Sequence, residues 1–107
     1  GSITATGTKT AVDFATAGAA GGDVYVFVHS ITGTATNAAI KVQSASTSGG
    51  AYADEATVTF SAKGTYSAAM TGAVDRWLRI STSSMGGATA FSVSVVACVD
   101  GVTQPTY

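Results

Sequence analysis

The side chains that most often carry nucleophilic or metal chemistry are scarce, with His29 as the only histidine and Cys98 as the only cysteine. His29 stands next to Ser30, and a histidine base beside a serine nucleophile is the pairing used in many hydrolases. Neighbours in an extended segment point to opposite faces, so this pair cannot meet. We therefore expect His29 to be a polar strand-end residue or a subunit contact, and Cys98 a small buried apolar side chain.

The acidic residues are dispersed in the same way. Asp54 and Glu55 are adjacent, so on a strand they would face apart and could not share an ion or a proton. The remaining acids fall near expected strand ends or loops, where carboxylates commonly cap turns: Asp13, Asp23, Asp75 and Asp100. No cluster has metal-ligand spacing, and no Gly-rich turn has the Gly-Lys-Ser/Thr ending of a phosphate loop. The sequence thus predicts no enzyme, metal site or cofactor.

Aromatic residues are the remaining candidates for a binding platform, namely Trp77, Tyr25, Tyr52 and Tyr66. Trp77 and Arg79 are two positions apart, which places them on one strand face, where the guanidinium can cover the indole. Two interpretations follow: an aromatic cap over one sheet, or a platform on which a sugar or base stacks.

Composition separates this chain from an ordinary soluble domain. Charged residues make up 10%, whereas about 25% is typical. Ala, Gly, Ser and Thr together account for 62 of the 107 residues. Small neutral surfaces are easily desolvated against a partner, so we interpret this as a protein that functions inside an assembly. The alternative is a secreted domain coated with Ser and Thr.

Partners other than protein are disfavoured. The net charge is −1 and the five basic residues are scattered, whereas nucleic-acid binding needs convergent cations. No apolar run reaches the length of roughly 18–20 residues that crosses a bilayer, and no signal-peptide pattern is present. We expect neither a nucleic acid nor a membrane as a partner.

Period-two alternation of apolar residues predicts a series of short strands separated by Gly-containing turns. The first, Asp23–Ile31, alternates with apolar residues on both faces, so we expect it in the interior. The others span Ala39–Ala45, Glu55–Ser61, Thr65–Met70, Arg76–Ser81 and Thr89–Val99. A tail from Asp100 to Tyr107 follows and contains the only proline, Pro105.

These strands predict an all-β protein, built as a single β-sandwich of jelly-roll or Ig-like topology. Residues 1–22 are expected to form an extended N-terminal arm, because they are rich in small residues and end in the loop-like stretch 15–22. The arm either pairs as a strand or orders only against a partner. Residues 23–107 form the β-sandwich domain in this division of the chain.

Two stretches of the chain share an outline with a group of viral proteins. The first is a strand ending in Val-Gln-x-Ser, then a Gly-containing hairpin, an aromatic and an acid. The second is a strand of the form Arg-aromatic-Leu-Arg-Ile, a Gly-rich turn and a strand resembling Thr-x-Phe-Ser-Val. In this sequence these elements are Val42-Gln43-Ser44, Gly49-Gly50, Tyr52, Asp54, Arg76-Trp77-Leu78-Arg79-Ile80, Gly86-Gly87 and Ala90-Phe91-Ser92-Val93.

The outline resembles small β-sandwich virion proteins of tailed phages, either capsid decoration (cement) proteins or tail-associated domains, and covers roughly residues 24–99. The hairpin usually carries Asp-Gly, whereas this chain has Gly49-Gly50, so no loop carboxylate is carried over. The resemblance leaves open a position on the head, the tail or a fibre.

The resemblance implies a decoration protein that stabilises the head by bridging coat subunits. Its partners would be the major capsid protein and itself, as a homo-oligomer and by analogy a trimer. It would be made in the host cytoplasm and lie on the outer surface of the capsid. The arm offers the candidate partner-binding residues Ile3, Val12 and Phe14. Two alternatives remain: a carbohydrate- or receptor-binding module, and a tail-fibre or tail-tube building block.

Overall fold

Ten β-strands form the architecture of the computed structural model, which describes residues 1–14, 21–70, 73–99 and 102–107. Residues 15–20 of the expected arm and the expected turn acid Asp100 lie outside these described residues. The strands are β1 Ser2–Ile3, β2 Gly7–Thr8, β3 Val12–Asp13, β4 Gly22–Thr32, β5 Ala38–Ala45, β6 Ala53–Phe60, β7 Gly64–Met70, β8 Trp77–Ser84, β9 Ala90–Val99 and β10 Val102–Pro105. The described chain contains no helix, and the all-β prediction is confirmed.

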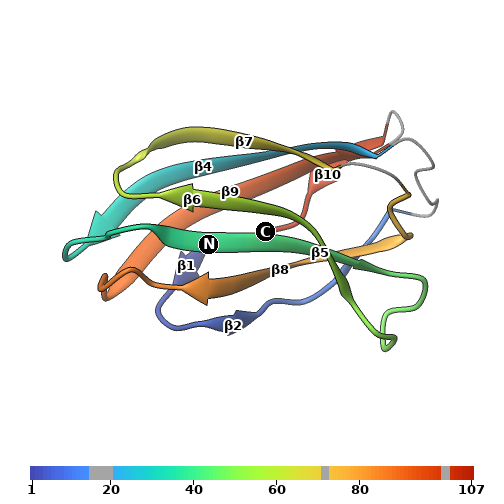
Figure 1. The fold of residues 1–107 in the computed structure, drawn as a ribbon, viewed down its shortest axis with the longest axis horizontal. Helices are drawn as coiled ribbons and strands as arrows, with labels where there is room; N and C mark the ends of the chain where they lie inside the picture. The colour runs from blue at the N-terminus through green and yellow to red at the C-terminus, as the bar shows by residue number, and fades with distance from the viewer. Residues whose placement is uncertain (15–20, 71–72, 100–101) are drawn as a thin grey trace.

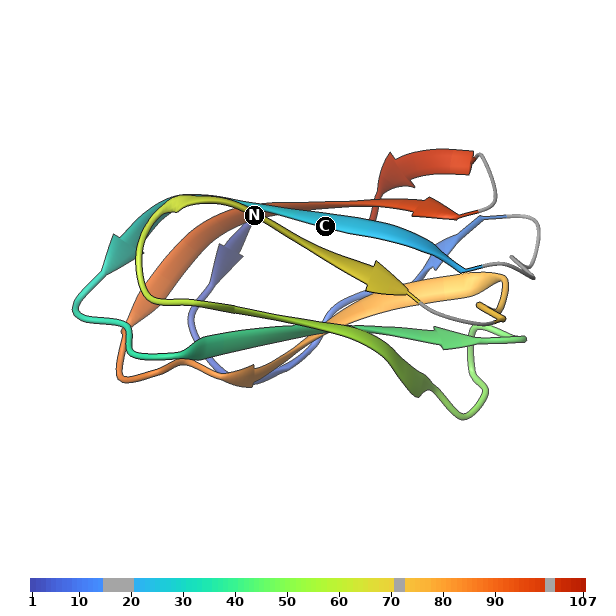
Figure 2. The ribbon, with the colours of Figure 1, turned by 45° about the horizontal axis from the view of Figure 1, so that its top comes forward.

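The strands form two antiparallel sheets that pack face to face (Figures 1 and 2). Sheet A has the order β1-β9-β4-β7, and β10 pairs with β9 beside β1. Sheet B has the order β2-β8-β5-β6, and β3 pairs with β8 beside β2. The predicted single β-sandwich is therefore confirmed.

The connections follow the winding of one long antiparallel ribbon. In this ribbon each strand of the first half of the chain pairs with one of the second half. The β5–β6 hairpin forms the closed end, β4 pairs with β7 next to it, and the short strands β1 and β2 pair with β9 and β8 at the open end. This rolled ribbon is a jelly roll. An Ig-like topology would place the last two long strands side by side in one sheet, whereas β8 and β9 belong to different sheets.

The core lies between the sheets and follows the predicted alternation. Apolar side chains of β4 and β9 in sheet A face those of β5, β6 and β8 in sheet B. The buried side chains include Val24, Val26, Val28, Ile40, Val42, Val58, Phe60, Leu78, Ile80, Phe91, Val93 and Val95. Phe60 and Phe91 meet edge to face across the two layers, with ring centroids 5.1 Å apart at 72°.

The second face of β4 differs from the expectation. β4 does lie in the interior of sheet A, between β9 and β7, yet Tyr25 and Phe27 point outward. Tyr25 remains 39% exposed and Phe27 is half-buried. Apolar residues on both faces of this strand predicted that both faces would be buried. The sandwich has only two layers, however, so one face of each sheet is turned to solvent.

Residues 1–14, the part of the expected N-terminal arm before the gap in the described chain, pair within the sandwich. They run from the edge of sheet A, where Ile3 pairs with Phe91, to the edge of sheet B, where Val12 pairs with Leu78. Arg76 fixes its end through a two-pronged contact, with Nε and Nη2 donating to the Asp13 carboxylate at 2.6 and 2.7 Å. Residues 1–14 thus bridge the two sheets along one side.

The C-terminal tail contributes a strand that the sequence did not predict. β10 pairs with the end of β9, and Pro105 lies opposite Val96. Proline cannot donate to a sheet ladder and is tolerated in edge strands, which is where β10 lies. Beyond it, Val95 O accepts from Thr106 N at 2.8 Å, and Val93 N donates to Gly1 O at 2.9 Å. Both ends of the chain therefore run along the same edge of β9.

Candidate interaction surface

The described residues hold no cluster of side chains suited to binding a metal ion. No group of three or more His, Cys, Asp or Glu side chains in this part of the chain is placed to hold a metal ion. Likewise, none of its segments forms a helix with the length and apolarity to cross a membrane. The surfaces of the two sheets are the remaining places to look for function.

The outer face of sheet A is almost free of ions. Among the residues in β1, β4, β7, β9 and β10, the only acidic or basic side chain besides His29 is Asp23. The strands of sheet B instead carry Asp13, Lys41, Asp54, Glu55 and Arg79. The strands of sheet A therefore carry far fewer ionisable side chains than those of sheet B.

Strand register sets the pattern of the sheet A face. Tyr25 has Ser67 on one side and Val96 on the other, and Pro105 lies beyond Val96. One row along, Phe27 has Thr65 and Ser94 as neighbours. Two aromatic side chains thus lie among small neutral ones near the middle of the face.

His29 and Ser94 meet at one end of this face, a contact that the sequence did not predict. Alternation with Tyr25 and Phe27 points His29 outward, and the register shift between Val28 and Ser30 leaves it without a paired residue on β9. Its Nε2 then lies 3.0 Å from Ser94 Oγ. Among the described residues no carboxylate hydrogen-bonds to the imidazole, so the group that orients histidine in a catalytic triad is not found there.

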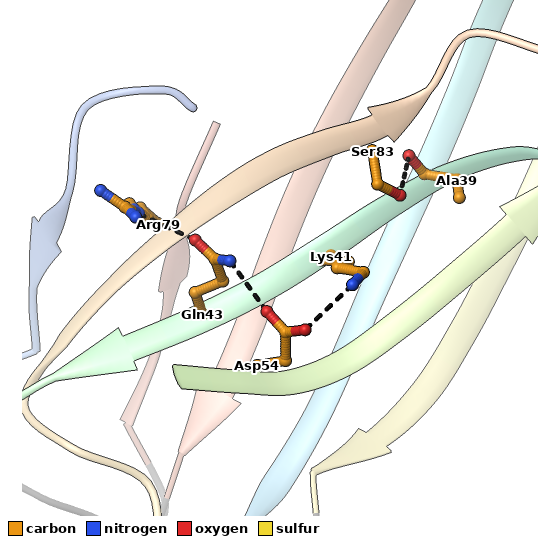
Figure 3. A network of polar contacts seen from close by, with 6 residues as sticks. All are labelled: Ala39, Lys41, Gln43, Asp54, Arg79 and Ser83. Atoms are coloured by element: carbon orange, nitrogen blue, oxygen red, sulfur yellow. Dashed lines mark hydrogen bonds and ion pairs between the residues drawn. The ribbon is translucent and has the colours of Figure 1, made fainter. Parts of the chain in front are cut away.

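The outer face of sheet B carries a chain of hydrogen bonds across β8, β5 and β6 (Figure 3). Arg79 Nε donates to Gln43 Oε1 at 2.9 Å, and Gln43 Nε2 donates to Asp54 Oδ1 at 2.8 Å. Lys41 Nζ donates to the second oxygen of Asp54 at 3.0 Å. The hydrogen bond from Gln43, followed by that from Lys41, lowers the pKa of Asp54.

The two adjacent acids do face apart, as predicted. Asp54 belongs to the outer network, whereas Glu55 accepts a hydrogen bond of 2.7 Å from the buried hydroxyl of Ser44. They do not form a shared site.

The aromatic contacts differ from those expected. The guanidinium of Arg79 lies 3.9 Å from the ring centroid of Tyr52, so it does not cover Trp77. Trp77 instead has Arg76 at 5.9 Å from its ring. Tyr52 precedes β6 and reaches the face because the β5–β6 hairpin folds back, and its hydroxyl donates to Ser48 O at 2.8 Å. Sequence spacing along one strand could not reveal this cross-strand pair.

The three candidate partner-binding residues of the arm have different environments. Ile3 is fully buried and Phe14 is 2% exposed, both within the chain's own core. Val12 is half-buried and lines a hollow of about 340 Å³ together with residues of the arm and tail, Lys9, Thr10, Pro105, Thr106 and Tyr107. A partner could reach only Val12 of the three in this conformation, and the partner contact itself stays a prediction.

Comparisons with protein-family models, with curated proteins and with solved structures find no match for this chain. Its function is therefore argued from its own surfaces.

Proposed function

We propose that this chain is a structural virion protein of a tailed phage, a capsid decoration protein that stabilises the head by bridging coat subunits. The observation that carries the proposal is the sheet A face, with one charged side chain in five strands. The resemblance of the two sequence stretches directs it toward phage particles.

The physical reason is the cost of desolvation. Covering an ionised side chain with protein removes its hydration, and that loss is offset only where a good ionic partner is present. Small hydroxyls and aliphatic groups lose little when covered, while Tyr25 and Phe27 supply apolar area for contact. In the proposed arrangement the coat protein covers the sheet A face, and the ions of sheet B point to solvent.

Stabilisation of the head follows from linkage. A partner that binds only the folded, assembled state stabilises it by about 2.7 kcal/mol when its concentration is 100 times the dissociation constant. The resemblance also implies a trimer; the bridging of coat subunits does not depend on that symmetry, and a dimer of this chain would serve it as well.

The direct test uses empty coat-protein shells from a tailed phage whose genome encodes this chain. Added protein should bind saturably in co-sedimentation, and the shells should then disassemble at a higher temperature. If the protein bound purified tails but not the shells, it would be assigned to the tail of the particle and not to the head. Binding to neither particle would contradict the proposal.

A carbohydrate- or receptor-binding module is the second candidate, and the sheet B network favours it. Gln43, Asp54 and Arg79 are held in place by one another beside Tyr52, and Trp77 lies on the same strand face as Arg79. Planar polar groups next to aromatic rings suit a sugar. Trp77 is the only tryptophan, so a bound glycan should change its fluorescence. A glycan array without hits and an unchanged Trp77 signal would dismiss this alternative.

A further inference from the structure

The four edges of the two sheets are protected to different degrees. On one side of the sandwich the edges are formed by short strands, β1 and β10 in sheet A and β2 and β3 in sheet B, and β10 also carries Pro105. On the other side, β6 ends sheet B and β7 ends sheet A, and no described residue pairs with their outer edges. Unpaired edges invite another strand, so natural proteins usually block them with charges, prolines or bulges.

β6 carries such protection and β7 does not. The register of β6 against β5 shifts beside Glu55, which forms a bulge, and Asp54 adds a second carboxylate. β7 pairs with β4 without any register shift from Gly64 to Met70. Its sequence, Gly-Thr-Tyr-Ser-Ala-Ala-Met, contains no charged residue and no proline.

We propose that the edge of β7 binds β7 of a second copy of this chain, antiparallel and with the two-fold axis at Ser67. Sheet A would then continue from one copy into the other. An antiparallel edge is self-complementary, because each strand offers the same row of N–H and C=O groups to its twin. The net charge of −1 gives two copies little reason to repel.

The side chains fit this register. On the outer face Ser67 meets its own copy, and Thr65 meets Ala69. On the inner face each large side chain meets a small one, since Tyr66 lies opposite Ala68 and Met70 opposite Gly64. Tyr66 is also held within its own copy, where its hydroxyl donates to Ala62 O at 2.6 Å. In this register no pair brings two charges or two bulky side chains together. A second copy of β7 therefore fits the edge along its whole length, whereas an unrelated strand would have such a complementary pattern only by chance.

Disulfide trapping tests the register. Directly opposed residues in an antiparallel pair have Cα atoms about 4.5–5.5 Å apart, which a disulfide spans. Ser67→Cys in a Cys98→Ser background should form a covalent dimer under mild oxidation. Thr57→Cys in the same background is the matched control, because Thr57 is exposed at the middle of the β6 edge, and it should remain monomeric. Equal cross-linking of both variants, or of neither, would overturn the proposal.

Sedimentation of the unmodified chain supplies the second measurement. A two-fold dimer is expected, and Ser67→Lys should weaken it about tenfold or more by placing two ammonium groups opposite each other. Thr57→Lys adds the same charge to the β6 edge and should leave the dimer intact. A wild-type monomer, a trimer, or a dimer that is indifferent to Ser67→Lys would each contradict pairing through β7. These outcomes do not depend on whether a phage capsid binds the protein.

Discussion

Gln43 occupies the centre of the sheet B network, where its amide accepts from Arg79 and donates to Asp54. Its position follows from strand register, since Gln43 pairs with Arg79 on β8 and with Asp54 on β6. Each of these hydrogen bonds is solvent-accessible or half-buried and adds little to stability by itself. Their combined effect is to hold the polar groups of this face in one arrangement.

The lowered pKa of Asp54 makes the network sensitive to acid. Because the folded protein binds this proton less readily than the unfolded chain, the stability from Asp54 is present above about pH 4 and is lost as the pH falls through the lowered pKa. Asp54→Asn should therefore lower the melting temperature by at most a few degrees at pH 7, and the difference should vanish in strong acid. Thermal melts of the two proteins across pH measure this. Asp23→Asn, on the other sheet and outside the network, is the control, and an equal difference at every pH would contradict the role given to Asp54.

Gly22 is required by a close approach of two strands. A Cβ atom at this position would overlap the carbonyl oxygen of Cys98, which belongs to the β9 backbone and cannot easily move. Gly22→Ala should therefore lower the free energy of unfolding by about 1–3 kcal/mol. Gly49→Ala, where no heavy atom lies within 4 Å of the added Cβ, should change it by less than about 0.5 kcal/mol. Chemical denaturation measures the free energy of unfolding of both variants. Similar losses for Gly22→Ala and Gly49→Ala would show that the close approach to Cys98 does not require glycine at position 22.

At the scale of elements, residues 1–14 of the arm are a structural part of the sandwich. They pair in segments of two residues, yet Ile3 and Phe14 fill the core between the sheets. A truncation that starts at Asp23 would remove both core side chains, so it would test folding as much as partner binding. Val12 is the better site for testing a partner contact of the arm, because it is the accessible member of the three candidates.

Ile3→Ala measures what the arm contributes to folding. The substitution empties a fully buried site and should reduce the free energy of unfolding by about 2–5 kcal/mol. Thr8→Ala, on the exposed part of the same arm, should change it by less than about 0.5 kcal/mol. Urea denaturation of the two variants compares them, and a near-neutral Ile3→Ala would mean that the arm is not packed as described.

The strands were predictable where alternation was strong and unpredictable where pairing was long-range. Val24, Val26 and Val28 indicated both β4 and its buried face, because period-two spacing is local information. β10 was missed because Pro105 argues against a strand unless an edge position is known. The contact between Arg79 and Tyr52 was missed because it depends on how a hairpin registers against β8, which no local pattern encodes.

At the scale of the whole molecule, the outer faces of the two sheets differ in charge. Sheet B carries most of the strand charges and its own hydrogen-bond network, as expected for a face in water. Sheet A offers a nearly ion-free face and the unprotected β7 edge. A chain with so few ions is poorly protected against self-association, so covering sheet A would also keep it in a defined assembly.

Shell binding by a pair of lysine variants tests this difference between the two faces most directly. Tyr25→Lys places a charge in the middle of the sheet A face, and Thr59→Lys places the same charge on exposed β6 of sheet B. In co-sedimentation with empty coat shells, Tyr25→Lys should lose about tenfold or more in affinity, because an unpaired ion would be covered, while Thr59→Lys binds like the unmodified protein. Full binding by Tyr25→Lys, or loss of binding by Thr59→Lys alone, would contradict the assignment of sheet A as the covered face.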